Sequence, residues 1–182
     1  TLRQLGITPY LMDLKPLALA RAVNRWEAII IDVQPSSVDI VIVVKGIPHV
    51  MRTISLPEEA SSSRETAAYL AVEVDKALSL YQSSYPNQPL GADTPVFITG
   101  EVADDSITRE VVDKVGYPVE SLSLPIKCPP DLPTAEYAVN IGLALKQVAL
   151  PARSGEGISP QLANLNILPE VYRERRQLIR QS

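Results

Sequence analysis

The apolar residues of this chain fall into two kinds of pattern, and each kind predicts a different element. Continuous apolar runs occur at Ala28–Asp32, which ends on the acid, and at Val38–Val44. A short run of this kind that lacks alternation is typical of a strand covered on both faces. Lys45-Gly46 forms a tight turn between the second run and a third predicted strand, His49–Ile54. We therefore expect a hairpin with a third strand beside it, central in one sheet.

Apolar residues at helical spacing predict helices around this hairpin. The first has Pro16 in its first turn, where proline is tolerated, and ends near Asn24. The second begins with a capping box at Ser62 and runs to about Tyr81. The other predicted elements are strands at Tyr10–Leu14, Pro95–Thr99 and Val119–Leu124, a helix from Asp105 or Ser106 to Gly116, and a helix at Thr134–Val148.

The resulting order is β-α-β-β-β-α-β-α-β-α, which predicts an α/β fold: a mixed sheet with helices on its faces. The segment after Pro95 favours a parallel crossover. Gly142, inside the last helix, suggests the close approach of another backbone. Composition changes after Leu150, so residues 1–150 are predicted to form the domain. Residues 151–182 are predicted to be a flexible linker and a docking-type tail with a basic end.

Composition narrows the class of protein. The 182 residues are 46% hydrophobic, which is enough for the core of one ordinary domain. The net charge of −4 argues against nucleic acid as the main partner, because phosphate backbones bind basic surfaces. No apolar run reaches the roughly 20 residues of a membrane-spanning helix, so no transmembrane segment is expected. The single Cys128 favours a reducing compartment.

Candidate chemistry concentrates at the end of the first apolar run. Asp32 could hold a metal or a water near a phosphate, or it could cap the following loop. Asp13 is expected to be a turn acid. His49 has no cluster of cysteines or carboxylates in the nearby sequence, so an exposed strand histidine is expected and no metal site is predicted. No catalytic residue is predicted either, since Ser61–Ser63 lack a nucleophile-elbow context.

The order and spacing of five stretches resemble the C-terminal half of the PilM family, the actin-like, FtsA-related proteins of type IV pilus assembly. The stretches are Tyr10–Arg21, Ile30–Val33, Val43–Gly46, Val96–Gly100 and Tyr137–Leu145. The resemblance implies an actin-like (ribonuclease H-like) second domain, half of a two-domain fold. It also implies two nucleotide loops, one holding Asp32, Ser36 and Ser37 and the other Gly100 and Ala103. The first half of such a protein is absent, so we expect a fragment or a reduced version.

Two departures from the family pattern oppose ATP. Where the family has small residues after the acid, this chain has Gln34 and Pro35, and proline has no N–H to offer a phosphate. Glu101 places a side chain and a negative charge where backbone should approach the ligand. The loops are therefore expected to be degenerate, with no cofactor bound by this half alone.

The function implied is a non-catalytic cytoplasmic scaffold of type IV pilus or type II secretion-like assembly, peripheral at the inner membrane. The alternative is an ATP-binding or ATPase module, with Mg²⁺, completed by the missing half. A sugar-kinase-like enzyme is disfavoured, because no substrate-binding acid and no aromatic platform is visible.

The tail carries a second resemblance. Asn164-Leu165-Asn166-Ile167-Leu168-Pro169, together with Tyr172, is similar to the segment at the start of PilN, the membrane partner of PilM. An extended apolar peptide of this kind suits a groove on a partner. The expected partners are a PilN-like inner-membrane protein or a PilM-type groove, and a homo-oligomer is possible. Docking within this chain is not expected, because the family's groove lies largely in the absent half.

Overall fold

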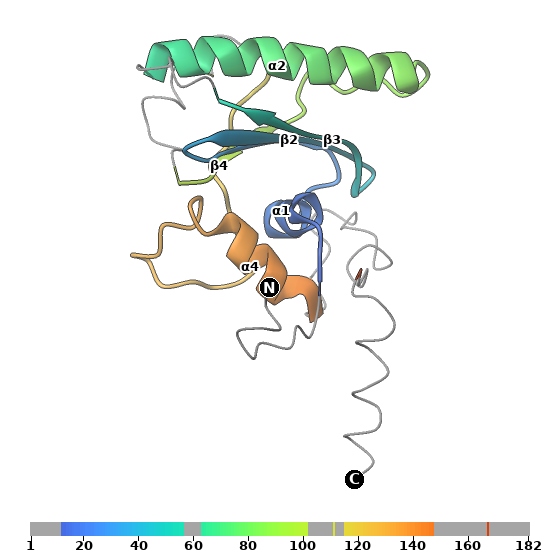
Figure 1. The fold of residues 1–182 in the computed structure, drawn as a ribbon. Helices are drawn as coiled ribbons and strands as arrows, with labels where there is room; N and C mark the ends of the chain where they lie inside the picture. The colour runs from blue at the N-terminus through green and yellow to red at the C-terminus, as the bar shows by residue number, and fades with distance from the viewer. Residues whose placement is uncertain (1–11, 57–62, 102–110, 112–114, 148–166, 168–182) are drawn as a thin grey trace.

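A computed structural model describes residues 12–56, 63–101, 111, 115–147 and 167 of the chain. A four-stranded sheet lies between a long helix on one side and two shorter helices on the other (Figure 1). The elements are α1 (Lys15–Val23), β1 (Ala28–Val33), β2 (Ser37–Val44), β3 (Ile47–Ser55), α2 (Ser63–Ser84), β4 (Val96–Thr99), α4 (Ala138–Ala144) and a 3₁₀ turn at Leu145–Gln147.

The sheet is mixed, as the sequence predicts. Its strand order is β3-β2-β1-β4, with β2 antiparallel to both of its neighbours and β1 parallel to β4. The hairpin turn uses Lys45 and Gly46, which both have positive φ, the geometry that tight hairpin turns require. The crossover predicted between the segments Pro95–Thr99 and Val119–Leu124 is parallel where they meet, at the single Val96–Val119 bridge, and β4 also pairs parallel to β1.

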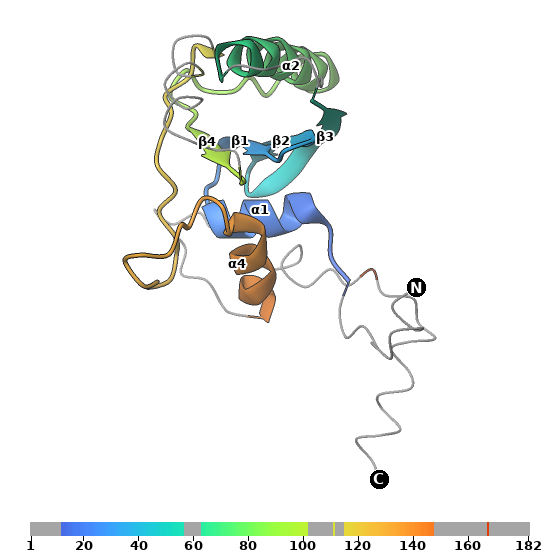
Figure 2. The ribbon, with the colours of Figure 1, turned by 60° about the vertical axis from the view of Figure 1, so that its left-hand side comes forward.

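Both faces of the sheet are covered, and this explains the absence of alternation in β1. Ile29 and Ile31 pack on the face under α2, whereas Ile30 packs with α1 residues on the opposite face. Figure 2 shows α2 on one side of the strands and α1 with α4 on the other. Each fully buried isoleucine contributes roughly 1.5–3 kcal/mol. The expectation of a central, doubly covered strand pair is confirmed.

Helices α1 and α4 touch at Gly142, where the sequence suggests close backbone approach. A Cβ at Gly142 would lie 1.8 Å from the carbonyl oxygen of Ala18. No side chain fits into that space, so only glycine allows this packing distance. The helix itself is shorter than predicted: α-helical geometry spans Ala138–Ala144 of the predicted Thr134–Val148, with turns before it and the 3₁₀ turn after it.

The predicted strand at Tyr10–Leu14 is not found at Met12–Leu14, and its first two residues lie outside the described part of the chain. The carbonyl of Leu14 instead accepts the first N–H groups of α1, from Leu17 at 3.0 Å and Ala18 at 3.1 Å. These residues are therefore committed to starting a helix, with Pro16 in the first turn as predicted. The helix ends at Asn24, whose left-handed φ of 47° closes it.

The predicted strand at Val119–Leu124 is also wrong, because it makes only a single bridge, between Val119 and Val96. Two hydrogen bonds make this bridge: the Val96 N–H donates to the Pro118 carbonyl at 2.8 Å, and the Glu120 N–H donates to the Val96 carbonyl at 2.9 Å. Pro118 itself has no N–H to extend the ladder. Of the helix expected to end at Gly116, Val111 and Val115 are helical and buried. Its start, and the capping residue Ser62, lie outside the described residues. No helix in the described part of the chain combines the length and apolar content needed to cross a membrane.

Candidate functional site

A row of polar residues crosses all four strands on the face that α1 covers. Asp32 and Asp39 are direct partners in the β1–β2 ladder. Thr53 stands opposite Asp39 on β3, and Thr99 stands opposite Asp32 on β4. Two carboxylates directly opposite each other destabilise a sheet unless a cation lies between them. The strand register therefore creates a site that needs positive charge.

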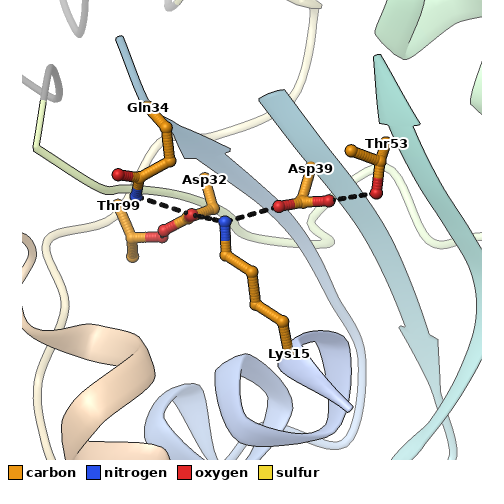
Figure 3. Close-up of polar contacts among 6 residues, drawn as sticks. All are labelled: Lys15, Asp32, Gln34, Asp39, Thr53 and Thr99. Atoms are coloured by element: carbon orange, nitrogen blue, oxygen red, sulfur yellow. Dashed lines mark hydrogen bonds and ion pairs between the residues drawn. The ribbon is translucent and has the colours of Figure 1, made fainter. Parts of the chain in front are cut away.

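Lys15 supplies that charge. It is the first residue of α1, and its side chain extends from the helix to a point between the two carboxylates (Figure 3). Its Nζ lies 2.6 Å from Oδ2 of Asp32 and 2.5 Å from Oδ2 of Asp39. The carboxylates are deeply buried, with side chains 1% and 7% exposed, while the lysine side chain is 32% exposed. The ammonium group thus lies between the two carboxylates, on a side chain that enters the site from the partly exposed edge.

Neutral donors satisfy the remaining carboxylate oxygens. The Thr99 hydroxyl donates to Oδ1 of Asp32 at 2.7 Å, and the Gln34 amide donates to its Oδ2 at 2.9 Å. The Thr53 hydroxyl donates to Oδ1 of Asp39. Each of the four carboxylate oxygens therefore has at least one donor, as buried charge requires.

The environment holds Lys15 in its charged form. Partial burial lowers its pKa, but the hydrogen bonds and charges of Asp32 and Asp39 outweigh that effect and raise the pKa above 10.5. The cation of this site is therefore part of the protein.

In the first loop that the resemblance assigns to nucleotide, backbone groups of the described residues are already hydrogen-bonded within the protein. The N–H of Gln34 donates to the carbonyl of Ser37 at 2.8 Å, and the Ser36 carbonyl accepts from Leu56 at 3.0 Å. Pro35 has no donor. The first of these bonds closes the β1–β2 turn and the second joins the turn to the end of β3. The Gln34 N–H is therefore not available to bind a phosphate.

Gly100 packs closely against the end of β1. Its φ of 105° and a would-be Cβ only 2.2 Å from the carbonyl of Val33 show that it packs against the end of β1. Its N–H donates to the carbonyl of Ala135 at 3.0 Å. The glycine is thus required for close packing between backbones. Ala103, the other residue assigned to this loop, lies outside the described residues. The N–H groups of Gln34 and Gly100 are thus already bonded within the protein.

An open pocket of about 370 Å³ lies beside Lys15. Its lining includes Lys15, Gln34, Glu101, Glu136, Tyr137 and Asn140. Both glutamates and the tyrosine are exposed. Because the lysine charge is already committed to Asp32 and Asp39, the charge left facing this pocket is negative.

A second buried ion cluster lies between α1 and α4. Asp13 has a second role beside the turn acid expected: its carboxylate is fully buried, pairs with Arg21 and lies 3.1 Å from Nζ of Lys146. It also accepts the N–H of Leu14 at 2.8 Å, which fits a turn. The sequence offers little warning of this cluster, because Asp13 and Lys146 are far apart in the chain.

Lys15 and Asp39 are the site residues that the sequence-based prediction missed. Asp39 interrupts an otherwise apolar strand seven residues after Asp32, and a two-strand hairpin register places the two side by side. That signal could have identified the pair. Lys15 could not be found in this way, because only the packing of α1 brings it there. Described residues contain no group of three or more histidine, cysteine or acidic side chains able to hold a metal.

Of the predicted docking tail, Ile167 alone lies within the described residues. Its N–H donates to the carbonyl of Met12 at 3.2 Å, and both side chains are exposed. At this residue the tail contacts the segment that precedes α1 of its own chain. The other residues assigned to docking, Asn164–Asn166, Leu168, Pro169 and Tyr172, lie outside the described residues.

Comparison with solved structures places the fold. PilM, solved in a PilM–PilN type IV pilus biogenesis complex, is similar over 81% of this chain and 56% of its own, with 17% identity and a TM-score of 0.57. AlfA from B. subtilis plasmid pLS32, solved as a filament, is similar over 71% and 42%, with 21% identity and a TM-score of 0.50. No family model and no curated protein matches the sequence. The fold is actin-like, and the chain spans about half the length of these proteins.

Proposed function

We propose that this chain belongs to a non-catalytic scaffold of type IV pilus-like assembly, which links cytoplasmic machinery to inner-membrane partners. The observation that carries the non-catalytic part is the ammonium of Lys15 between Asp32 and Asp39 (Figure 3). A nucleotide-hydrolysing site of this fold would need that position for a metal ion or a water. Here a side chain fills it.

The charge around the site also disfavours a nucleotide. A bound nucleotide phosphate requires unpaired backbone donors and positive charge. The N–H groups of Gln34 and Gly100 are already bonded within the protein. Glu101 and Glu136 line the adjoining pocket and would repel a phosphate. These contacts support a role that depends on shape and surface and does not require turnover.

The pilus assignment is supported by the PilM-like stretches of the sequence and by the fold it shares with PilM. From these we infer a PilN-like partner and a peripheral position at the inner membrane. Fold alone does not decide function among actin-like proteins. The assignment therefore depends on partner binding, which can be measured directly.

Nucleotide binding tests the non-catalytic part. Titration of MgATP into the chain in a calorimeter is expected to give no saturable heat. A dissociation constant in the low micromolar range, about −8 kcal/mol, would overturn it. The alternative is an ATPase that another half of the fold completes. The same titration on an actin-like protein that contains this chain together with such a half tests that alternative.

Partner binding tests the scaffold part. A peptide covering Asn164–Arg173 is expected to bind a complete PilM-type protein through its apolar side chains. The matched control peptide carries Ile167→Asp and Leu168→Asp, and it should not bind. Equal binding by both peptides, or by neither, would remove the tail from the proposed scaffold.

A further inference from the structure

Strand β3 is an edge of the sheet: β2 pairs with one of its sides and, in the part of the chain that the structure describes, no strand pairs with the other (Figure 2). The Leu56 N–H donates to the Ser36 carbonyl, so this position bonds across to β2, and in an antiparallel ladder every second residue does the same. The Gln34–Ser37 bond gives the same alternation from the other side of β2. The residues between turn their N–H and carbonyl groups to the open edge, and these are Met51, Thr53 and Ser55.

Both ends of this edge are blocked. The β2–β3 register skips His49, which lies between Pro48 and Val50 as a bulge. A bulge and a proline are two of the features that keep an edge strand from pairing with another chain. At the other end, the Ser55 carbonyl accepts a hydrogen bond from the hydroxyl of Tyr69 on α2 at 3.2 Å. The first and last parts of β3 are therefore poor templates for a further strand.

The middle of the edge has no such feature. Within the described residues, the outward N–H and carbonyl groups of Met51 and Thr53 have no hydrogen-bond partner. The Met51 side chain beside them is 49% exposed. A row of open backbone groups next to an exposed apolar side chain is a template for another extended strand. The open stretch is short, so a matching strand needs to pair with it in a defined register.

The charges and the bulge select that register when the second strand is β3 of another copy. Antiparallel self-pairing can be centred on Met51, Arg52 or Thr53. A centre at Arg52 puts two arginines directly opposite each other, which destabilises a sheet. A centre at Met51 sets Thr53 against the bulge at His49 of the second copy. A centre at Thr53 avoids both conflicts, because Thr53 then faces itself and Met51 faces Ser55.

We propose that the occupant of this edge is a second copy of the chain, whose β3 pairs antiparallel with the first about a two-fold axis at Thr53. The two threonines exchange both of their N–H···O bonds, and the Met51–Ser55 pairs extend the ladder on each side. Arg52 lies opposite Ile54, and its charge is already paired with Glu73 at 3.0 Å. The contact uses the same patch on both copies and closes on itself, so it yields a dimer and no longer assembly. It does not depend on the proposed function.

Hydrogen exchange of the full chain at two concentrations tests the pairing. In dilute solution the amides of Met51 and Thr53 should exchange fast, whereas the Arg52 amide, bonded to β2, should be slow. At a concentration where about nine-tenths of the chains are paired, exchange at Met51 and Thr53 should slow about tenfold, because only unpaired chains exchange. Sedimentation equilibrium on the same samples should show the mass doubling in step. Arg52 should be unchanged and serves as the internal control.

Two variants separate the backbone bonds from the exposed side chain. Met51→Pro removes an outward N–H and leaves the ladder to β2 intact, so it should abolish the dimer. Met51→Ala removes the same side chain but keeps the N–H, and it should still dimerise. Thermal melting shows whether the proline variant folds, and if it does not, hydrogen exchange decides alone.

Several results would overturn the proposal. One is a chain that remains monomeric at about 1 mM. Another is a doubled mass while Met51 and Thr53 still exchange fast, which would place the contact on a different surface. Dimerisation by a folded Met51→Pro variant, or its loss in Met51→Ala, would exclude pairing through the backbone of this edge. None of these results bears on the MgATP titration or on peptide binding, so failure here is distinct from failure of the proposed function.

Discussion

Two buried ion clusters of the described residues both involve α1, one through Lys15 at its start and the other through Arg21 in its last turn, yet their composition is opposite. In the sheet cluster, Asp32 and Asp39 share one ammonium from Lys15. In the helix cluster, two cations, Arg21 and Lys146, share the single carboxylate of Asp13. The first opens to solvent through its lysine, whereas all three side chains of the second are at most 2% exposed.

The clusters also differ in how completely they are satisfied. Every carboxylate oxygen of the sheet cluster has a donor, including threonines from the neighbouring strands. In the helix cluster, Nε and Nη1 of Arg21 are buried without a hydrogen-bond partner among the residues that the structure describes. Burial lowers the pKa of Arg21, although the charge of Asp13 opposes that effect. The sheet cluster is therefore a completed polar network, whereas the two buried cations of the helix cluster share a single carboxylate, that of Asp13.

The largest expected effect is therefore at Asp13. Asp13→Asn leaves two buried cations facing a neutral amide, and removing one partner of a buried pair costs about 3–5 kcal/mol. Urea denaturation of the variant should show this loss in the free energy of unfolding. Asp75→Asn, an identical change at an exposed position of α2, should alter stability by less than about 0.5 kcal/mol. Equal stability of the two variants would mean that the helix cluster does not form.

A smaller effect is expected at Lys15. Lys15→Met keeps an unbranched side chain but removes the ammonium group, which leaves Asp32 and Asp39 facing each other without a cation. Because threonine and glutamine donors remain and the lysine is partly exposed, we expect a loss of roughly 1–3 kcal/mol. Adding Asp39→Asn to Lys15→Met removes the like-charge contact and should recover part of it. A double variant less stable than Lys15→Met would contradict the assigned charge balance.

The smallest effect is the pH dependence of the same pair. Because folding raises the pKa of Lys15, its contribution is fully present below pH 10.5 and is lost as pH rises through the raised value. The stability difference between wild type and Lys15→Met should therefore be constant at neutral pH and shrink above pH 10.5. A difference that stays constant into strong alkali would show that Lys15 is not coupled to the carboxylates.

Much of the fold follows from local pattern. The unalternating runs of β1 and β2 identify strands with two covered faces, and Gly142 identifies a close helix contact. Pro16 locates the first turn of α1. Each of these features depends on the conformation or burial of the residue itself, and the amino-acid type constrains both directly. The predicted strands that are not found, at Met12–Leu14 and Val119–Leu124, instead precede a helix or pack against the core, and the hydrophobicity of a single segment does not separate these roles from strand pairing.

The sequence by itself also determined that the Asp32 loop is altered, because Gln34 and Pro35 are visible in it. What fills the site was decided only by tertiary structure. Strand register set Asp39 beside Asp32, and the packing of α1 on the sheet carried Lys15 to them. Electrostatic partners of this kind depend on distances of a few ångströms between elements remote in the chain. Such distances are fixed by packing, which no local pattern of residues records.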